Sequence, residues 1–273
     1  MIRAIITDLD GTILPRGGAI SAETFQAFEK AGQMHYTRII ATGRNLYSAR
    51  KVLPPGFPID YLIFSSGAGM LRWTDQQILF ARHLSQQSTR EIARYLWDYN
   101  VNFTIQRKIP DNHHFYYTRL DPMHEDYKRR IATYEPFGIP IDSPNDIKGQ
   151  TTQFVMILDA RQIRLLEQIR KDLPDYSVVR STSPIDTKAI WLEIFAQDIN
   201  KGTTCLQLLK QLDISPNECA GLGNDYNDVD FLDLCGEAFL VGNAPCRLKP
   251  YYKSVASDRN NGFTEFITRI IKA

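Results

Sequence analysis

The stretch that most constrains the fold is residues 5–12, where a short apolar run ends in two aspartates and a glycine. Side chains two residues apart on a strand point the same way, so Asp8 and Asp10 are expected to converge just beyond the carboxyl end of a strand. In open α/β sheets this edge is the usual place for a ligand site. A lone Asp-x-Asp is more often a polar surface turn, so the assignment depends on the rest of the chain.

Strands, loops and helices alternate on both sides of a long middle segment. Strands are expected at residues 3–7, 36–41, 61–64, 219–222, 238–241 and 254–256. Helices are expected after Ser21, after Arg44, from Lys201, over 231–235 and over 263–271. This alternation predicts an α/β fold with a doubly wound, mostly parallel, Rossmann-like sheet.

The middle segment has a different pattern, introduced by a hairpin over 70–81. It contains helices expected at 89–99, 125–134 and 161–173, strands at 101–107, 115–119 and 152–158, two more strands within 176–181 and 189–195, and a Pro- and Gly-bearing stretch at 136–149 without an assigned element. The pattern is that of an α+β module. We therefore expect an inserted cap domain at 84–195 and a core formed by 1–83 and 196–273.

Four stretches together resemble the motifs of the haloacid dehalogenase-like (HAD) hydrolases, in the order typical of that family. They are Asp-Leu-Asp-Gly-Thr-Ile at 8–13, Ala-Thr-Gly-Arg at 41–44, Asn-Lys-Gly at 200–202 and Gly-Asn-Asp-Tyr-Asn-Asp at 223–228. The resemblance runs from about residue 2 to about residue 263. The long insert between the second and third motifs is similar to the cap of the Cof-type branch, whose members are mostly small-molecule phosphatases.

The resemblance implies a phosphatase that works through an aspartyl-phosphate. Asp8 would be the nucleophile, and Asp10 would protonate the leaving group and then deprotonate the attacking water. Lys201 would place a positive charge over the phosphoryl oxygens. The Thr42 hydroxyl would donate to the same oxygens, since a strand-to-helix junction is a ready phosphate cradle.

Further phosphate contacts are expected from the amides of Leu9 and Gly43 and from Asn227. Arg44 is expected to contact the substrate. The cap also carries basic and imidazole side chains that could bind sugar hydroxyls or a second anionic group, although each is more often a solvated surface residue: Arg107, His113, His114, Arg119, Arg180 and Lys188.

A hard cation is needed to offset the repulsion between a carboxylate and a phosphate dianion, and Mg²⁺ suits oxygen ligands. The implied ligands are Asp8, the main-chain carbonyl of Asp10, Asn224 and Asp228, with Asp225 as an alternative. The family usually has aspartate where this chain has Asn224. A neutral amide neutralises less charge, so either Mg²⁺ affinity is lower or a neighbouring carboxylate compensates.

Charge and cysteine content limit the other possibilities. The 32 basic and 31 acidic side chains nearly cancel, so bulk charge gives no sign of a nucleic-acid or membrane partner. No apolar run approaches a membrane span, and the expected location is the cytoplasm, with the oligomeric state, monomer or dimer, left open. The cysteines, expected to be reduced core thiols, are Cys205, Cys219, Cys235 and Cys246.

The expected function is therefore Mg²⁺-dependent hydrolysis of a small phosphorylated metabolite, a sugar phosphate or a cofactor-type phosphate monoester. A phosphotransferase or phosphomutase would share the first half-reaction, and the motifs do not separate it from a phosphatase. A catalytically weak sugar-phosphate-binding protein is the third possibility. It is favoured by Asn224 and opposed by the intact Asp8, Asp10, Thr42 and Lys201.

Overall fold

The computed structural model describes residues 1–120, 122–182 and 189–272. The chain forms two compact units, one of Met1–Phe80 with Asn200–Ala273 and one of Ala81–Ile199. The expected boundaries at 83/84 and 195/196, and the functional division into catalytic core and cap, stay predictions. No helix among the described residues has both the length and the apolar content that crossing a membrane requires.

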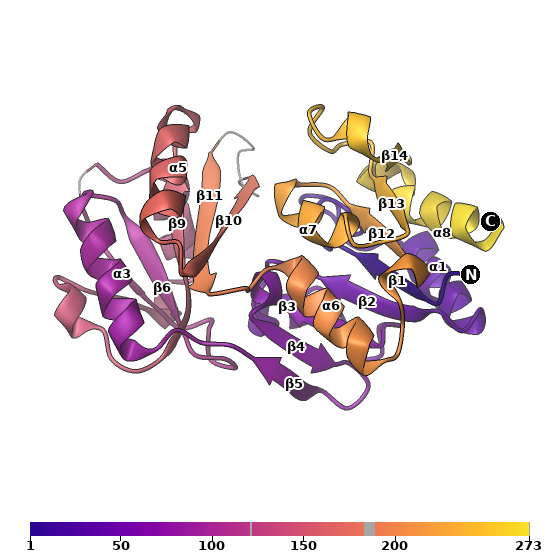
Figure 1. Ribbon diagram of the computed structural model, residues 1–273, viewed down its shortest axis with the longest axis horizontal. Helices are drawn as coiled ribbons and strands as arrows, with labels where there is room; N and C mark the ends of the chain where they lie inside the picture. Colours follow the sequence, from indigo (N-terminus) through magenta and orange to yellow (C-terminus); the bar gives the residue numbers. More distant parts are fainter. Residues whose placement is uncertain (121, 183–188, 273) are drawn as a thin grey trace. The chain divides into compact units, whose positions relative to one another are not determined.

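The first unit is built on an eight-stranded sheet with the order β14-β13-β12-β1-β2-β3-β4-β5 (Figure 1). Its strands are β1 (Ala4–Thr7), β2 (Thr37–Ala41), β3 (Tyr61–Phe64), β4 (Gly69–Arg72), β5 (Gln77–Ala81), β12 (Cys219–Gly223), β13 (Glu237–Leu240) and β14 (Lys253–Ser254). The pairings from β14 to β3 are parallel, and β4 is antiparallel to β3. The predicted doubly wound, mostly parallel α/β core is confirmed.

Helices cover both faces of this sheet. They are α1 (Ala22–Gln33), α2 (Leu46–Arg50), α6 (Lys201–Gln211), α7 (Val229–Leu232) and α8 (Gly262–Lys272). Ile6 of β1 packs in one cluster with Leu208 of α6 and Phe231 of α7. Because strand side chains alternate between faces, Ile5 points to the other face. Phe28 of α1 and Phe263 of α8 stack on each other, with ring centroids 4.2 Å apart.

The register of the central strands determines which loops meet. Thr7, the last residue of β1, is level with Leu222 of β12 and with Ile40 of β2. All four β1 residues are buried, as expected for a strand covered on both sides. The segments that follow β1, β2 and β12 therefore begin side by side at one edge of the sheet.

The second unit is an α+β module with a six-stranded sheet in the order β10-β11-β9-β6-β7-β8. Its elements are α3 (Gln86–Asp98), β6 (Phe103–Arg107), β7 (Phe115–Tyr117), α4 (Glu125–Thr133), β8 (Gly138–Pro140), β9 (Thr151–Leu158), α5 (Ile163–Asp172), β10 (Tyr176–Thr182) and β11 (Ile190–Ala196). The pairings are antiparallel except for β7 with β8. The central strand β9 is buried along its whole length.

Some expected elements differ from the structure. The helix expected at 231–235 is the single turn α7, and the stretch at 136–149 contains the short strand β8. The helix expected from residue 89 begins at Gln86, because Ser85 caps it by accepting from the Ser88 amide. Cys246 is exposed, so the expectation of core thiols is wrong for that residue; Cys205 and Cys219 are buried.

Candidate active site

Asp8 lies directly after β1, and its amide donates to the carbonyl of Leu222 on the neighbouring strand at 3.0 Å. The following turn brings the Thr12 hydroxyl back to Asp8 Oδ2 at 3.2 Å. The turn is closed by the amide of Gly11, which has a φ of +76° and donates to the carbonyl of Leu14 at 2.8 Å. Asp8 is thereby held with 5% exposure at the edge where the segments after β2 and β12 also begin.

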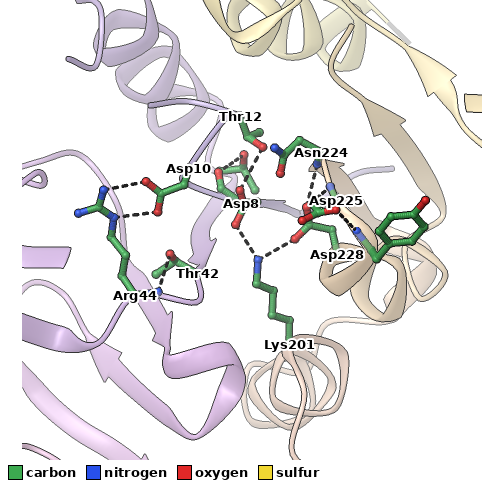
Figure 2. A network of polar contacts seen from close by, with 11 residues as sticks. Asp8, Asp10, Thr12, Thr42, Arg44, Lys201, Asn224, Asp225 and Asp228 are labelled. Atoms are coloured by element: carbon green, nitrogen blue, oxygen red, sulfur yellow. Dashed lines mark hydrogen bonds and ion pairs between the residues drawn. The ribbon is translucent and has the colours of Figure 1, made fainter. Parts of the chain in front are cut away.

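Lys201 connects Asp8 to the fourth motif. Its Nζ donates to Asp8 Oδ1 at 2.6 Å and to Asp228 Oδ1 at 2.7 Å (Figure 2). The lysine opens α6, whose N-cap Asn200 accepts from the Thr203 amide at 2.8 Å. Gly202 follows it, and a side chain there would overlap the carbonyl oxygen of Asp230. The glycine therefore allows the start of α6 to approach α7, which directly follows the fourth motif.

Burial determines the electrostatics of this network. Desolvation raises the pKa of Asp8 to about 7, opposed by the charge of Lys201 and reinforced by Asp228. Burial alone would lower the pKa of Lys201, but the two carboxylates outweigh it and raise that pKa above its usual value. Two carboxylates share one buried ammonium, so the network accommodates a further positive charge.

Asp10 is held by the second motif. Both of its carboxylate oxygens accept from the guanidinium of Arg44, at 2.8 Å from Nε and 2.7 Å from Nη2. Thr42 is fully buried, and its hydroxyl oxygen accepts from the Arg44 amide at 3.1 Å. Gly43 is exposed between them.

The residues of the fourth motif differ in their burial and in their hydrogen bonds. Asp228 is fully buried, and while its Oδ1 accepts from Lys201, its Oδ2 accepts from the amides of Asn224 and Asp225 at 2.8 and 3.0 Å. Asp225 Oδ1 accepts from the Tyr226 amide at 2.8 Å. Asn227 is half-buried in the same turn.

The Asn224 side chain lies against the first motif, since a Cβ on Gly11 would clash with its Nδ2. No group of three His, Cys, Asp or Glu side chains suited to a metal occurs in the described parts of the chain. The expected set is instead mixed: the carboxylates of Asp8 and Asp228, the main-chain carbonyl of Asp10 and the amide oxygen of Asn224, with Asp225 as the alternative. All of these are hard oxygen donors, and donors of this kind suit Mg²⁺.

Sequence reasoning gave no role to two residues that shape the site. Thr12 lay within the first motif, and its spacing of four residues from Asp8 was a signal that could have suggested the contact. Asn243 donates from Nδ2 to the carbonyl of Gly11 at 2.8 Å and accepts from the Asp258 amide at 3.0 Å. It follows a strand in an ordinary turn, so no local pattern pointed to it.

The basic and imidazole residues named for the cap are spread over the second unit. The rings of His113 and His114 lie 4.3 Å apart, and both contact Phe137 edge-on. Arg119 pairs with Asp142 at 3.7 Å. Arg107 is exposed at the end of β6, and Arg180 lies on β10. Lys188 is outside the described residues.

Nearly the whole chain is similar in sequence to known phosphatases. The chain is 22% identical over 285 residues to the HMP-PP phosphatase of Klebsiella pneumoniae, covering 98% of this chain and 95% of the relative. It is 23% identical over 290 residues to the 5-amino-6-(5-phospho-D-ribitylamino)uracil phosphatase YwtE of Bacillus subtilis, covering 99% and 98%.

Among solved structures, the fold is similar to that of BT1666 from Bacteroides thetaiotaomicron, described as a phosphatase of the HAD enzyme superfamily. The TM-score is 0.82 at 18% identity, over 100% of this chain and 96% of the other. The model of the haloacid dehalogenase-like hydrolase family matches residues 5–267. With that match and the four motifs gathered at one edge of the core sheet, the chain belongs to the haloacid dehalogenase-like hydrolases.

Proposed function

We propose that this protein is a Mg²⁺-dependent phosphatase that hydrolyses a small phosphorylated metabolite through an aspartyl-phosphate on Asp8. The observation that carries the proposal is the buried ammonium of Lys201, 2.6 Å from Asp8 Oδ1 and 2.7 Å from Asp228 Oδ1. A carboxylate fixed beside a buried cation at the carboxyl end of a parallel strand is suited to attack an anionic phosphorus centre.

In the first half-reaction, a carboxylate oxygen of Asp8 forms a bond to phosphorus as the bond from phosphorus to the leaving oxygen breaks. The leaving oxygen takes a proton from Asp10, and the product alcohol departs. Lys201 and the Thr42 hydroxyl stabilise the charge on the phosphoryl oxygens, with the amides of Leu9 and Gly43 and the side chain of Asn227.

In the second half-reaction, a water oxygen bonds to phosphorus and gives a proton to Asp10, while the bond from phosphorus to Asp8 breaks. Inorganic phosphate leaves, and both carboxylates return to their starting states. Mg²⁺, held by Asp8, the Asp10 carbonyl and Asn224, would supply the charge that lets a carboxylate approach a phosphate dianion. Asp228 holds Lys201 and the turn at 224–225 in place.

A small substrate is supported by the relatives, one of which is named for a ribitylaminouracil phosphate. The α+β unit at 81–199 contains none of the four motifs. We assign it the role of a cap that recognises the leaving group, because a lid that excludes water favours small substrates over folded phosphoproteins.

Release of inorganic phosphate from p-nitrophenyl phosphate tests the proposal. Activity that requires Mg²⁺, stops with EDTA and is lost in Asp8→Asn is the expected result. Activity of Asp8→Asn within about tenfold of the unmodified protein would contradict the nucleophile assignment, since tenfold corresponds to only about 1.4 kcal/mol.

Two further measurements separate the other two possibilities. Phosphoryl transfer to an added sugar in preference to water would identify a phosphotransferase. Binding of sugar phosphates without turnover, in protein that binds Mg²⁺, would identify a binding protein and contradict the proposal.

A further inference from the structure

The side chain of Arg44 orients the carboxylate of Asp10. Arg44 donates from Nε to Oδ2 at 2.8 Å and from Nη2 to Oδ1 at 2.7 Å, a two-point contact visible in Figure 2. Both Asp10 carboxylate oxygens therefore accept from one guanidinium. A planar fork of this kind fixes both the position and the plane of a carboxylate, which a single contact would leave free to rotate.

Arg44 is itself held by contacts of both its side chain and its backbone. Its Nη1 donates to the carbonyl of Ser48 on α2 at 3.2 Å. Its amide donates to the Thr42 hydroxyl oxygen at 3.1 Å, and its carbonyl accepts from the Ser65 amide at 2.7 Å. The guanidinium is therefore a rigid support for Asp10 within the first unit.

We infer that Arg44 is a positioning residue that aims the acid/base carboxylate of Asp10 at the leaving oxygen and, later, at the attacking water. The inference rests on the proposed function, in which Asp10 moves a proton in both half-reactions. A misplacement of about 1 Å can cost roughly 100-fold in rate. Weakening the fork should therefore impair proton transfer although Asp10 remains in the chain.

Substrates that differ in leaving group reveal this role. Phenyl and p-nitrophenyl phosphate are similar in shape, but phenolate is the poorer leaving group because phenol, like the tyrosine side chain, has a pKa of about 10. Phenyl phosphate therefore depends more on the proton from Asp10. A residue that only binds substrate, or only stabilises the fold, would affect both esters alike.

The test is a double-mutant cycle measured as kcat/KM for both esters in unmodified protein, Arg44→Lys, Asp10→Asn and the double variant. Lysine keeps the charge and loses the two-point contact. We expect Arg44→Lys to lower kcat/KM for phenyl phosphate by about 10- to 100-fold, within the usual range for misplaced general-acid catalysis, and to lower it clearly less for p-nitrophenyl phosphate. In the Asp10→Asn background the same substitution should change neither value by more than about twofold.

A matched control is available in the Arg38–Asp60 pair of the same unit. Arg38 donates from Nε and Nη2 to the two Asp60 oxygens at 2.9 and 2.8 Å. Its side chain is 19% exposed and that of Asp60 29%, against 28% and 39% for Arg44 and Asp10. Arg38→Lys should leave the ratio of the two kcat/KM values unchanged. Arg44→Gln is a second variant if Arg44→Lys does not fold.

Equal losses for both esters, or a loss that persists in the Asp10→Asn background, would overturn the inference and assign Arg44 to the substrate. A change of the ratio in Arg38→Lys as large as in Arg44→Lys would also overturn it. These outcomes leave the phosphatase proposal intact. If the unmodified protein hydrolyses neither ester, or if activity survives Asp8→Asn, the proposed function itself fails.

Discussion

At the scale of single residues, the central feature is one ammonium shared by two buried carboxylates. Lys201 is 1% exposed, Asp8 5% and Asp228 0%. Removing one member of such a buried network leaves charges without a partner, which is far more costly than losing a surface pair. The same three side chains therefore contribute both to the stability of the site and to its proposed chemistry.

Lys201→Met should reduce kcat by about 1000-fold, since it removes a fixed charge aimed at the transferring phosphoryl group. It should also lower the melting temperature, because Asp8 and Asp228 lose their common partner. Lys210→Met, on the exposed side of the last turn of the same helix, is the control and should change neither. Loss of stability with unchanged kcat would mean that Lys201 is only structural.

Asn224→Asp should raise Mg²⁺ affinity on the order of tenfold, about 1.4 kcal/mol, because a charged oxygen replaces a neutral one beside a hard cation. Mg²⁺-dependent shifts of the melting temperature measure this without relying on turnover. The double variant with Asp225→Asn should return almost to the original affinity only if Asp225 already compensates for Asn224. An unchanged affinity in Asn224→Asp would remove this position from the metal site.

The sequence allowed some of these residues to be predicted and not others. The spacing of Asp8 and Asp10 and the order of the motifs pointed to the segments that meet at the sheet edge. The contact between Asp10 and Arg44, and the support of Gly11 by Asn243, join residues far apart in the chain. Such contacts depend on the register of strands, which a local pattern does not determine.

At the scale of elements, the turn at Ser65–Gly67 links two of the segments that form the site. Ser66 donates its amide to the carbonyl of Thr42 at 3.0 Å, and Thr204 of α6 donates its hydroxyl to the carbonyl of Gly67 at 2.8 Å. Ser65, Ser66 and Gly67 all have positive φ, at 50°, 51° and 104°. Strain of this kind persists where surrounding contacts enforce it.

Gly67→Ala should lower kcat/KM by at least about tenfold, because a side chain there would overlap the carbonyl oxygen of Asn200 and displace the start of α6 with Lys201. Gly149→Ala is the matched control. Gly149 also has a positive φ, +80°, but has no atom within 4 Å of an added Cβ. It should show only the backbone cost, about 1 kcal/mol, with kcat/KM retained. Similar effects of the two substitutions on kcat/KM would contradict the linking role of the turn.

Long, strongly patterned elements could be predicted, and short ones could not. The eight-residue β9 carries a continuous apolar and β-branched signal, whereas β8 has three residues and includes Pro140. Pairing of β8 with β7 comes from the rest of the fold and not from its own propensity. The early start of α3 follows from the Ser85 cap, since Gln86–Ser88 adds no apolar periodicity.

At the scale of the whole molecule, two separated pieces of chain form one unit. Residues 1–80 and 200–273 are joined where β1 pairs with β12. Every residue that we assign to the catalytic machinery lies in this unit. The unit at 81–199 has its own six-stranded sheet. Each of the two units can therefore bury side chains against a sheet of its own.

Replacing residues 84–195 by a short Gly/Ser linker should therefore leave a folded protein that still binds Mg²⁺. It should hydrolyse p-nitrophenyl phosphate weakly and have lost most discrimination among phosphorylated metabolites. Circular dichroism, Mg²⁺-dependent melting and a substrate panel measure these three properties. Discrimination equal to that of the full chain would contradict the role of the second unit as a specificity cap, and a chain that cannot fold would contradict the proposed boundaries.

In the proposed mechanism, Asp8 becomes phosphorylated during turnover. The most direct measurement is acid quenching during steady-state hydrolysis, followed by mass spectrometry of the intact protein and its peptides. We expect one added phosphoryl group on Asp8, removed by hydroxylamine as expected for an acyl phosphate and absent in Asp8→Asn. A phosphoryl group on any other residue, or active enzyme that never carries one under quenching that preserves acyl phosphates, would contradict it.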